Sequence, residues 1–161
     1  MVTTENEMRE LEKEIVRSVI DLRNLGISNV NEASARVIAA KNIKNPGNTK
    51  NCLENGIKMV EYIEKNGQAS QSELTKISGY APSQNGSLSP TSCGVIVIVD
   101  HQRPDSKSDY KKSGCIYNFK LASPGLGERY KGIAWGLIEK FSLLTNSKNV
   151  GGKTEVDCSE N

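Results

Sequence analysis

The sequence predicts an α+β chain in which helices come first, a β-hairpin follows and a long helix closes the fold. Three observations predict this fold class. Residues 59–79 have the apolar spacing and the end signals of two helices joined by a short turn. Residues 95–99 are all β-branched, and residues 114–121 alternate, as strands do. Apolar residues then recur at helical spacing from 126 to 144.

Length and composition bound the size of the core. The chain has 161 residues, of which 36% are apolar and 5% aromatic. This suits one domain, or one domain with an extra helical segment. The net charge of +2 is too small to establish nucleic-acid binding by itself, so the distribution of charge has to be considered.

The clearest local signals lie around the turn at residue 67. Asn66 and Gly67 end the first helix, because residues of these types take the left-handed conformation at low cost. Ser70 begins the second helix, Glu73 completes a capping box, and Gly79 ends that helix. The inward-facing apolar positions are Ile57, Val60, Ile63, Leu74 and Ile77.

The run IEKNGQASQSELTKISGYAPSQNGSL resembles the front half of a winged helix-turn-helix domain. The family pattern is an amphipathic helix, a Gly-ended turn, Ser/Thr-x-x-Glu-Leu, a Gly and then a recognition helix. Ser70, Glu73, Leu74 and Gly79 match it, and the resemblance covers about residues 49–143. It implies binding to double-stranded DNA as a dimer, in regulation of transcription or in replication or partition.

The segment before this domain is predicted to be helical. Residues 5–25 carry an apolar stripe that suits either packing on the chain's own domain or pairing with a second copy. The stripe consists of Met8, Leu11, Ile15, Val19 and Leu22. Gly26 ends this helix.

A second helix is expected over residues 30–42, capped by Asn29, with Glu32 three residues later. Ala33, Val37 and Ile38 would form its buried face. Residues 45–48 read as a turn, since Pro and Gly favour turns. The predicted organisation is an N-terminal helical segment over 1–46, a winged domain over 47–144 and a disordered tail over 145–161.

Two interpretations compete for the recognition helix. Ser89 and Pro90 form a good helix start, which would give a recognition helix from Ser89 to about Val99. The β-branched run at 95–99 favours strand instead, with a short helix inside 82–93 and the first wing strand at 94–100.

The wing and the closing helix follow. A polar segment, 100–113, separates the β-branched run from the strand at 114–121, which places Cys115, Tyr117, Phe119 and Leu121 on one face. Strand, loop and strand make a hairpin. The closing helix, started by Ser123 and Pro124, carries one apolar stripe of Leu126, Tyr130, Ile133, Ala134, Leu137, Phe141 and Leu144.

Candidate DNA contacts fall in two segments. Residues 103–131 hold seven Lys and Arg against three acids, whereas residues 5–23 hold four against six. Phosphate contacts are therefore expected from the wing. Its candidates are Arg103, Lys107, Lys111 and Lys112. Small hydrogen-bonding side chains that suit bases or phosphates are Gln84, Asn85, Ser87, Ser89, Thr91 and Ser92.

The sequence offers little support for other functions. The single histidine, His101, lies beside Asp100 in a polar segment and is expected to be solvated rather than catalytic, so no enzyme activity and no cofactor are predicted. The four cysteines have no CxxC spacing, which argues against zinc and for buried or free thiols. The polar N-terminus and the lack of a long apolar run indicate the cytoplasm. The alternative function is a winged-helix module that docks proteins and binds no DNA.

Overall fold

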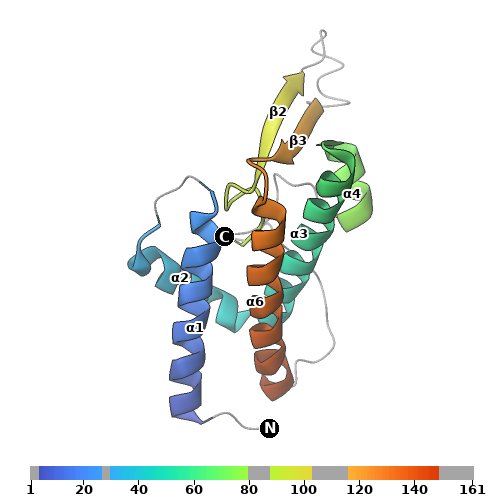
Figure 1. Ribbon diagram of the computed structural model, residues 1–161. Helices are drawn as coiled ribbons and strands as arrows, with labels where there is room; N and C mark the ends of the chain where they lie inside the picture. Colours follow the sequence, from blue (N-terminus) through green and yellow to red (C-terminus); the bar gives the residue numbers. More distant parts are fainter. Residues whose placement is uncertain (1–3, 27–29, 80–87, 103–115, 149–161) are drawn as a thin grey trace, which may run out of the picture.

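The computed structural model describes residues 4–26, 30–79, 88–102 and 116–148. These residues form an α+β structure of five helices and a small three-stranded antiparallel sheet. The helices form one elongated body, and two strands project from one end of it (Figure 1). In chain order the elements are α1 (Glu5–Asn24), α2 (Glu32–Lys44), α3 (Pro46–Asn66), β1 (Ala69–Ser70), α4 (Gln71–Ser78), β2 (Ile96–Gln102), β3 (Ile116–Leu121) and α6 (Leu126–Lys148).

The core lies where α6 packs between α1 and α3 (Figure 1). The stripe predicted for the closing helix is buried, apart from Ile133, which is only partly buried against the core. Tyr130 and Phe141 are fully enclosed, so the largest side chains of α6 fill the centre of the molecule. Such burial stabilises the fold by roughly 25 cal/mol for each Å² of apolar surface removed from water.

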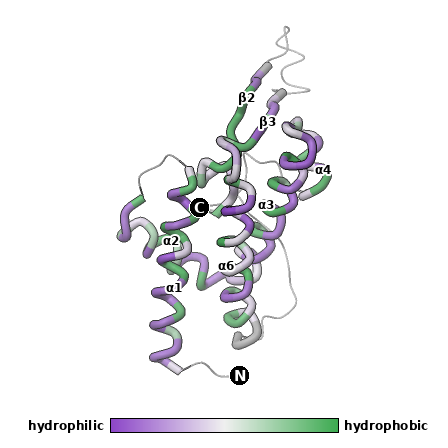
Figure 2. The backbone as a smooth tube through the Cα atoms, in the orientation of Figure 1, coloured by the Kyte–Doolittle hydropathy of each residue, from purple (hydrophilic) through white to green (hydrophobic). Residues whose placement is uncertain are grey.

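The apolar stripe of α1 belongs to this same core. Ile15, Val19 and Leu22 are fully buried, and Met8 and Leu11 pack against the cluster while partly exposed. Purple and green alternate along α1, as expected of a helix with one buried face (Figure 2). The structure therefore favours the interpretation in which this helix packs on its own domain, because the stripe is already covered within one chain.

The second helix differs from its prediction in both its start and its buried face. Asn31, not Asn29, is the N-cap, and its side chain accepts a hydrogen bond of 2.8 Å from the backbone N–H of Ser34. Ala35 and Ala39 are buried, and Ile38 is partly buried against the core as predicted. Ala33 is exposed and Val37 is 69% exposed. The two buried alanines are one turn apart, and their small side chains let α2 approach α1 closely.

Residues 45–48 were predicted to form a turn between two segments, and this is wrong. Pro46 is the first residue of α3, where its missing N–H costs no hydrogen bond. The end signals of α3 and α4 are confirmed, since Gly67 and Gly79 have φ of 85° and 86° at the two C-caps. Part of the predicted tail is also helical, because α6 continues to Lys148. Residues 149–161 lie outside the described part of the chain.

The predicted hairpin is confirmed, and it carries a third strand that the sequence did not reveal. The strand order is β1-β3-β2, and both pairings are antiparallel. Ala69 pairs with Phe119, which is 1% exposed and anchors the sheet in the core. The two residues of β1 thus connect the turn between α3 and α4 to the hairpin.

Candidate nucleic-acid interface

The hairpin is the element that would present a wing. β2 and β3 pair from Ile96 with Leu121 to Gln102 with Ile116, with an irregularity in register between Ile98 and Asp100. The chain leaves β2 at Gln102 and returns at Ile116, at the end of the hairpin away from the helical body (Figure 1). The four predicted phosphate contacts, Arg103, Lys107, Lys111 and Lys112, lie in the segment between these ends, which is outside the described residues.

The outer part of the hairpin carries a stacked pair of rings. His101 was expected in a solvated loop, but it lies in β2 directly opposite Tyr117 of β3. Their ring centroids are 4.5 Å apart and the planes differ by 6°. Asn118 donates a hydrogen bond of 3.3 Å to Asp100, the histidine's neighbour. These cross-strand contacts hold the two strands together.

Two apolar side chains are exposed on β2. Ile98 is 52% exposed and Val99 is 41% exposed. β2 is an edge strand of the sheet, so its outer backbone edge has no strand partner among the described residues. The irregularity after Ile98 is a feature that commonly blunts such edges.

The capped helix α4 contacts α3 through a hydrogen bond between Tyr62 and Glu73, and its Leu74 is buried in the core. The Ser70 hydroxyl accepts from the Glu73 backbone N–H at 3.2 Å, and the Glu73 carboxylate accepts from the Ser70 N–H at 2.8 Å. Tyr62 of α3 donates its hydroxyl proton to the same carboxylate at 3.1 Å. The Ser70 backbone bond, and then the Tyr62 bond, hold the pKa of Glu73 below its usual value. The predicted capping box is confirmed.

The recognition helix predicted from Ser89 to about Val99 is wrong. Residues 88–94 form turns, and β2 begins at Ile96, so the strand interpretation of the β-branched run is confirmed. β-branched side chains lose rotamer freedom in a helix and pack well in a sheet, which explains this preference. The alternative helix within 82–93 falls largely on residues 80–87, which are not described, and no helix is present at 88–93.

The predicted base-contacting side chains fall into two groups, one outside the described residues and one within this turn. Gln84, Asn85 and Ser87 lie outside the described residues. Ser89 is fully buried, and its hydroxyl contacts the hydroxyls of Thr91 at 3.1 Å and Ser92 at 2.9 Å. The structure uses the Ser89 side chain to shape the turn, so we do not propose it as a DNA contact. Thr91 and Ser92 are partly exposed.

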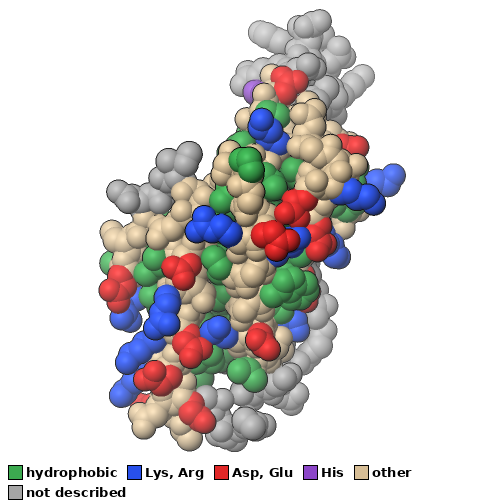
Figure 3. Space-filling view, in the orientation of Figure 1, with side chains coloured by type: hydrophobic (Ala, Val, Ile, Leu, Met, Phe, Trp, Pro, Cys, Tyr) green, Lys and Arg blue, Asp and Glu red, His purple; other side chains and the backbone are tan. Residues whose placement is uncertain are grey.

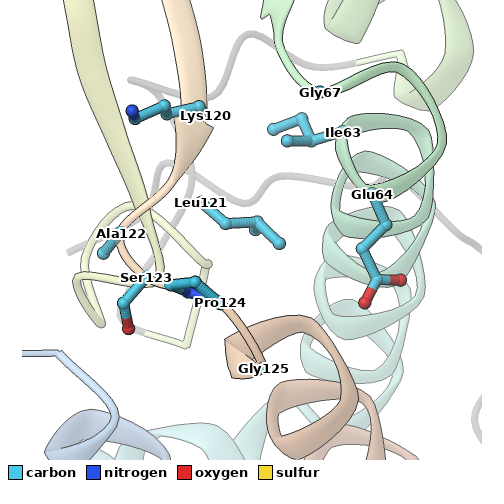
Figure 4. Close-up of a pocket in the computed structure, with 9 residues that line it drawn as sticks. All are labelled: Ile63, Glu64, Gly67, Lys120, Leu121, Ala122, Ser123, Pro124 and Gly125. Carbon is cyan, nitrogen blue, oxygen red and sulfur yellow. The ribbon is translucent and has the colours of Figure 1, made fainter.

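A hollow of about 490 Å³ lies where the hairpin meets the helical body (Figure 4). Its walls come from the end of α3, the end of β3 and the residues before α6, and they include Glu64, Lys120 and Ser123. The Glu64 carboxylate accepts a hydrogen bond of 2.8 Å from the Lys131 amine. This pair joins α3 to α6 and raises the pKa of Lys131, mainly through that hydrogen bond. Gly127 makes room for Glu64, because a Cβ at Gly127 would collide with the carboxylate.

The remaining features of the described residues concern metal ligands, thiols and membrane spans. No group of three His, Cys, Asp or Glu side chains that could hold a metal occurs in the described part of the chain. Cys93 is buried and carries a reduced thiol, and its burial raises the pKa of that thiol to about 12. Cys52 is disulfide-bonded, so the expectation of thiols alone is wrong for this residue. No helix within the described ranges is long and apolar enough to cross a membrane.

Comparison of the chain with protein-family models, with curated proteins and with solved structures finds no match.

Proposed function

We propose that this chain is a double-stranded DNA-binding protein of the winged-helix type, acting in regulation of transcription or in replication or partition. The observation that supports this best is the connection between the helix pair and the hairpin. β1, in the turn between α3 and α4, pairs with β3, so the strand that leads into the capped helix and the hairpin belong to one sheet. A helix pair joined through one sheet to a projecting hairpin suits a duplex, which offers a groove beside a phosphate backbone.

The charge of the hairpin segment supports the same proposal. Between Gln102 and Ile116 the sequence has four Lys or Arg residues and two aspartates, Asp105 and Asp109. Because the two strands are paired, the segment that carries these charges begins and ends at the tip of the described hairpin. Cations at such a place are well situated to neutralise phosphates, which supplies most of the sequence-independent affinity for DNA.

A second candidate function is docking to another protein. Over the face shown in Figure 3, basic and acidic side chains are interspersed, so this face has no extended basic field. Ile98 and Val99 are exposed on an edge strand, which is a common place for a partner to bind. These observations favour a protein partner if the chain does not bind DNA.

Titration of a random-sequence duplex, followed by electrophoretic mobility shift, distinguishes the two functions. A shift at about 50 mM salt that weakens at moderate salt is expected from a few phosphate contacts. Replacing Lys111 and Lys112 by Ala should weaken binding to all sequences about equally and flatten the slope of log affinity against log salt by up to about two. Lys13→Ala is the matched control, because Lys13 is exposed on α1 and should leave the slope unchanged.

Sequence preference is tested separately. Replacing Gln84 and Asn85 by Ala should change the preference among duplexes if these amides contact base edges. Absence of any shift at about 50 mM salt contradicts DNA binding and favours the protein-docking function. A double lysine variant that keeps the parent's salt slope contradicts the assignment of the wing as the phosphate-binding element.

A further inference from the structure

The outer face of α6 points away from the core and carries two large apolar side chains in contact with solvent. Trp135 is 52% exposed and Leu143 is 57% exposed. Only three other large hydrophobic residues of the described chain are comparably exposed, and all lie on other elements. An exposed tryptophan matters because tryptophan is enriched at the energetic centres of protein interfaces.

Two glycines lie in one narrow strip along this face. At about 100° per residue, Gly132, Gly136 and Leu143 fall within a strip roughly 40° wide on the side of α6 opposite the core. A Cβ added at Gly132 would have no atom within 4 Å, and at Gly136 it would meet only the Lys140 amine at 4.0 Å. Glycine weakens a helix relative to alanine, and here it also lets another helix approach closely.

Opposite charges lie on the two sides of this strip. Glu128 and Glu139 lie on one side, with Trp135 between them, and Arg129 and Lys140 lie on the other. In the sequence, each of these glutamates is followed directly by one of these basic residues. The two acid–base neighbours are eleven residues apart, which is about three helical turns. The Glu128 side chain is 83% exposed and lies 3.8 Å from the Lys131 amine. The Lys140 side chain is 25% exposed, and its amine lies 3.9 Å from the Glu14 carboxylate of α1.

This charge pattern favours one orientation when the α6 helices of two copies pair. When two identical helices lie parallel about a two-fold axis, the acidic side of each helix faces the basic side of the other on both flanks. In an antiparallel two-fold pair, acid faces acid and base faces base, which is unfavourable. The charges of α6 are therefore complementary to a parallel copy of α6.

We propose that the outer face of α6 is the surface on which a second copy of this chain docks, with the two α6 helices parallel. The stripe of α1 cannot serve this role, since it is buried in the core of its own chain. One helix face is small compared with the roughly 800 Å² that each partner buries in a stable complex. Association is therefore expected only at roughly 10–100 μM protein, because so small an interface is typical of weak complexes. It does not depend on DNA.

Sedimentation velocity and the fluorescence of the single tryptophan test this proposal without DNA. Between about 1 and 200 μM the sedimentation coefficient should rise, and Trp135 emission should shift to shorter wavelength as the indole leaves water. Leu143→Glu should raise the concentration needed for association at least tenfold. The matched control is Val37→Glu, since Val37 is 69% exposed on α2 and should leave association unchanged.

Charge and orientation are tested with further variants. A chain with Glu128→Lys and Glu139→Lys, and a chain with Arg129→Glu and Lys140→Glu, should each stay monomeric, whereas their mixture should associate. Gly132→Cys should give a cross-linked dimer on mild oxidation, because residue 132 faces itself in a parallel pair. The parent chain and Val37→Cys, oxidised in the same way, are the controls for the other cysteines.

Some results would overturn the docking surface, and another would overturn the parallel orientation. A parent chain that remains monomeric at 200 μM, or a Leu143→Glu variant that associates as the parent does, removes α6 as the docking surface. Association without cross-linking at residue 132 removes the parallel orientation.

Discussion

At the scale of single residues, the junction of α3 and α4 depends on one carboxylate. Glu73 accepts hydrogen bonds from the Ser70 backbone at 2.8 Å and from the Tyr62 hydroxyl at 3.1 Å. The first bond caps α4, and the second fixes its start to the preceding helix. The capping box was evident from the spacing of Ser70 and Glu73, but the contact with Tyr62 depends on the angle between two helices, which spacing alone does not determine.

Glu73 should make the stability of the chain depend on acid. Its pKa in the folded state is lowered, so its stabilising effect is fully present above the unfolded-state value of 4.5 and is lost as pH falls through the folded-state pKa. Glu73→Gln should be less stable than the parent near neutral pH, and the difference should shrink in denaturant melts below about pH 4. Glu61→Gln, an exposed change on α3, serves as control. A difference that stays constant down to pH 3 would show that the charge of Glu73 does not matter.

At the scale of elements, end signals were predicted better than faces and pairings. Gly67, Ser70 and Gly79 specify helix ends through local backbone chemistry, and all three ends are where the sequence placed them. The buried face of α2 was mispredicted because the small Ala35 and Ala39 gave a weaker hydrophobic signal than Val37, although close packing on α1 favours alanine. β1 has only two residues, and its pairing with the distant Phe119 leaves no local pattern.

The same limit applies to the candidate site. The hairpin could be predicted because β-branched residues at 95–99 and alternation at 114–121 are local signals. The helix start at Ser89 was predicted wrongly because a Ser-Pro pair starts helices and turns alike. Only the tertiary structure shows that the Ser89 hydroxyl is buried. The stacking of His101 on Tyr117 depends on a strand register that the sequence does not fix.

Two glycines of α3 should respond oppositely to the same substitution. A Cβ at Gly56 would collide with the Tyr130 hydroxyl and lie 2.9 Å from the Pro90 ring, so α3 and α6 would have to separate. Gly56→Ala should destabilise the chain by about 1–3 kcal/mol. A Cβ at Gly47 meets nothing within 4 Å, so Gly47→Ala should stabilise the helix by up to about 1 kcal/mol.

Chemical denaturation of the two variants gives the comparison directly. Equal effects of the two substitutions would mean that α3 and α6 do not pack as closely as Gly56 allows. Both substitutions add one methyl group to the same helix, so a difference in sign between them reports on the packing around Gly56.

At the scale of the whole molecule, the N-terminal helices and the rest of the chain share a core. Ile15 and Val19 of α1 belong to the same buried cluster as Leu53 of α3 and Leu137 of α6. Gly26 contributes to this arrangement, because a Cβ there would collide with the backbone carbonyl of Cys93 in the turn before β2. The end of α1 therefore lies against the segment that leads into the hairpin.

A shared core predicts that a substitution that destabilises α1 also destabilises the other helices. Ile15 is fully buried, and Ile15→Ala should cost about 2–5 kcal/mol through lost burial and the cavity that remains. If the core unfolds as one unit, hydrogen exchange of the slowest amides in α3 and α6 should accelerate by the same free energy as that of α1. Val37→Ala, at a position 69% exposed, should change stability by less than about 0.5 kcal/mol. Faster exchange confined to α1 and α2 would instead mean that residues 1–46 form a separate unit, and that truncation before α3 would leave a folded domain.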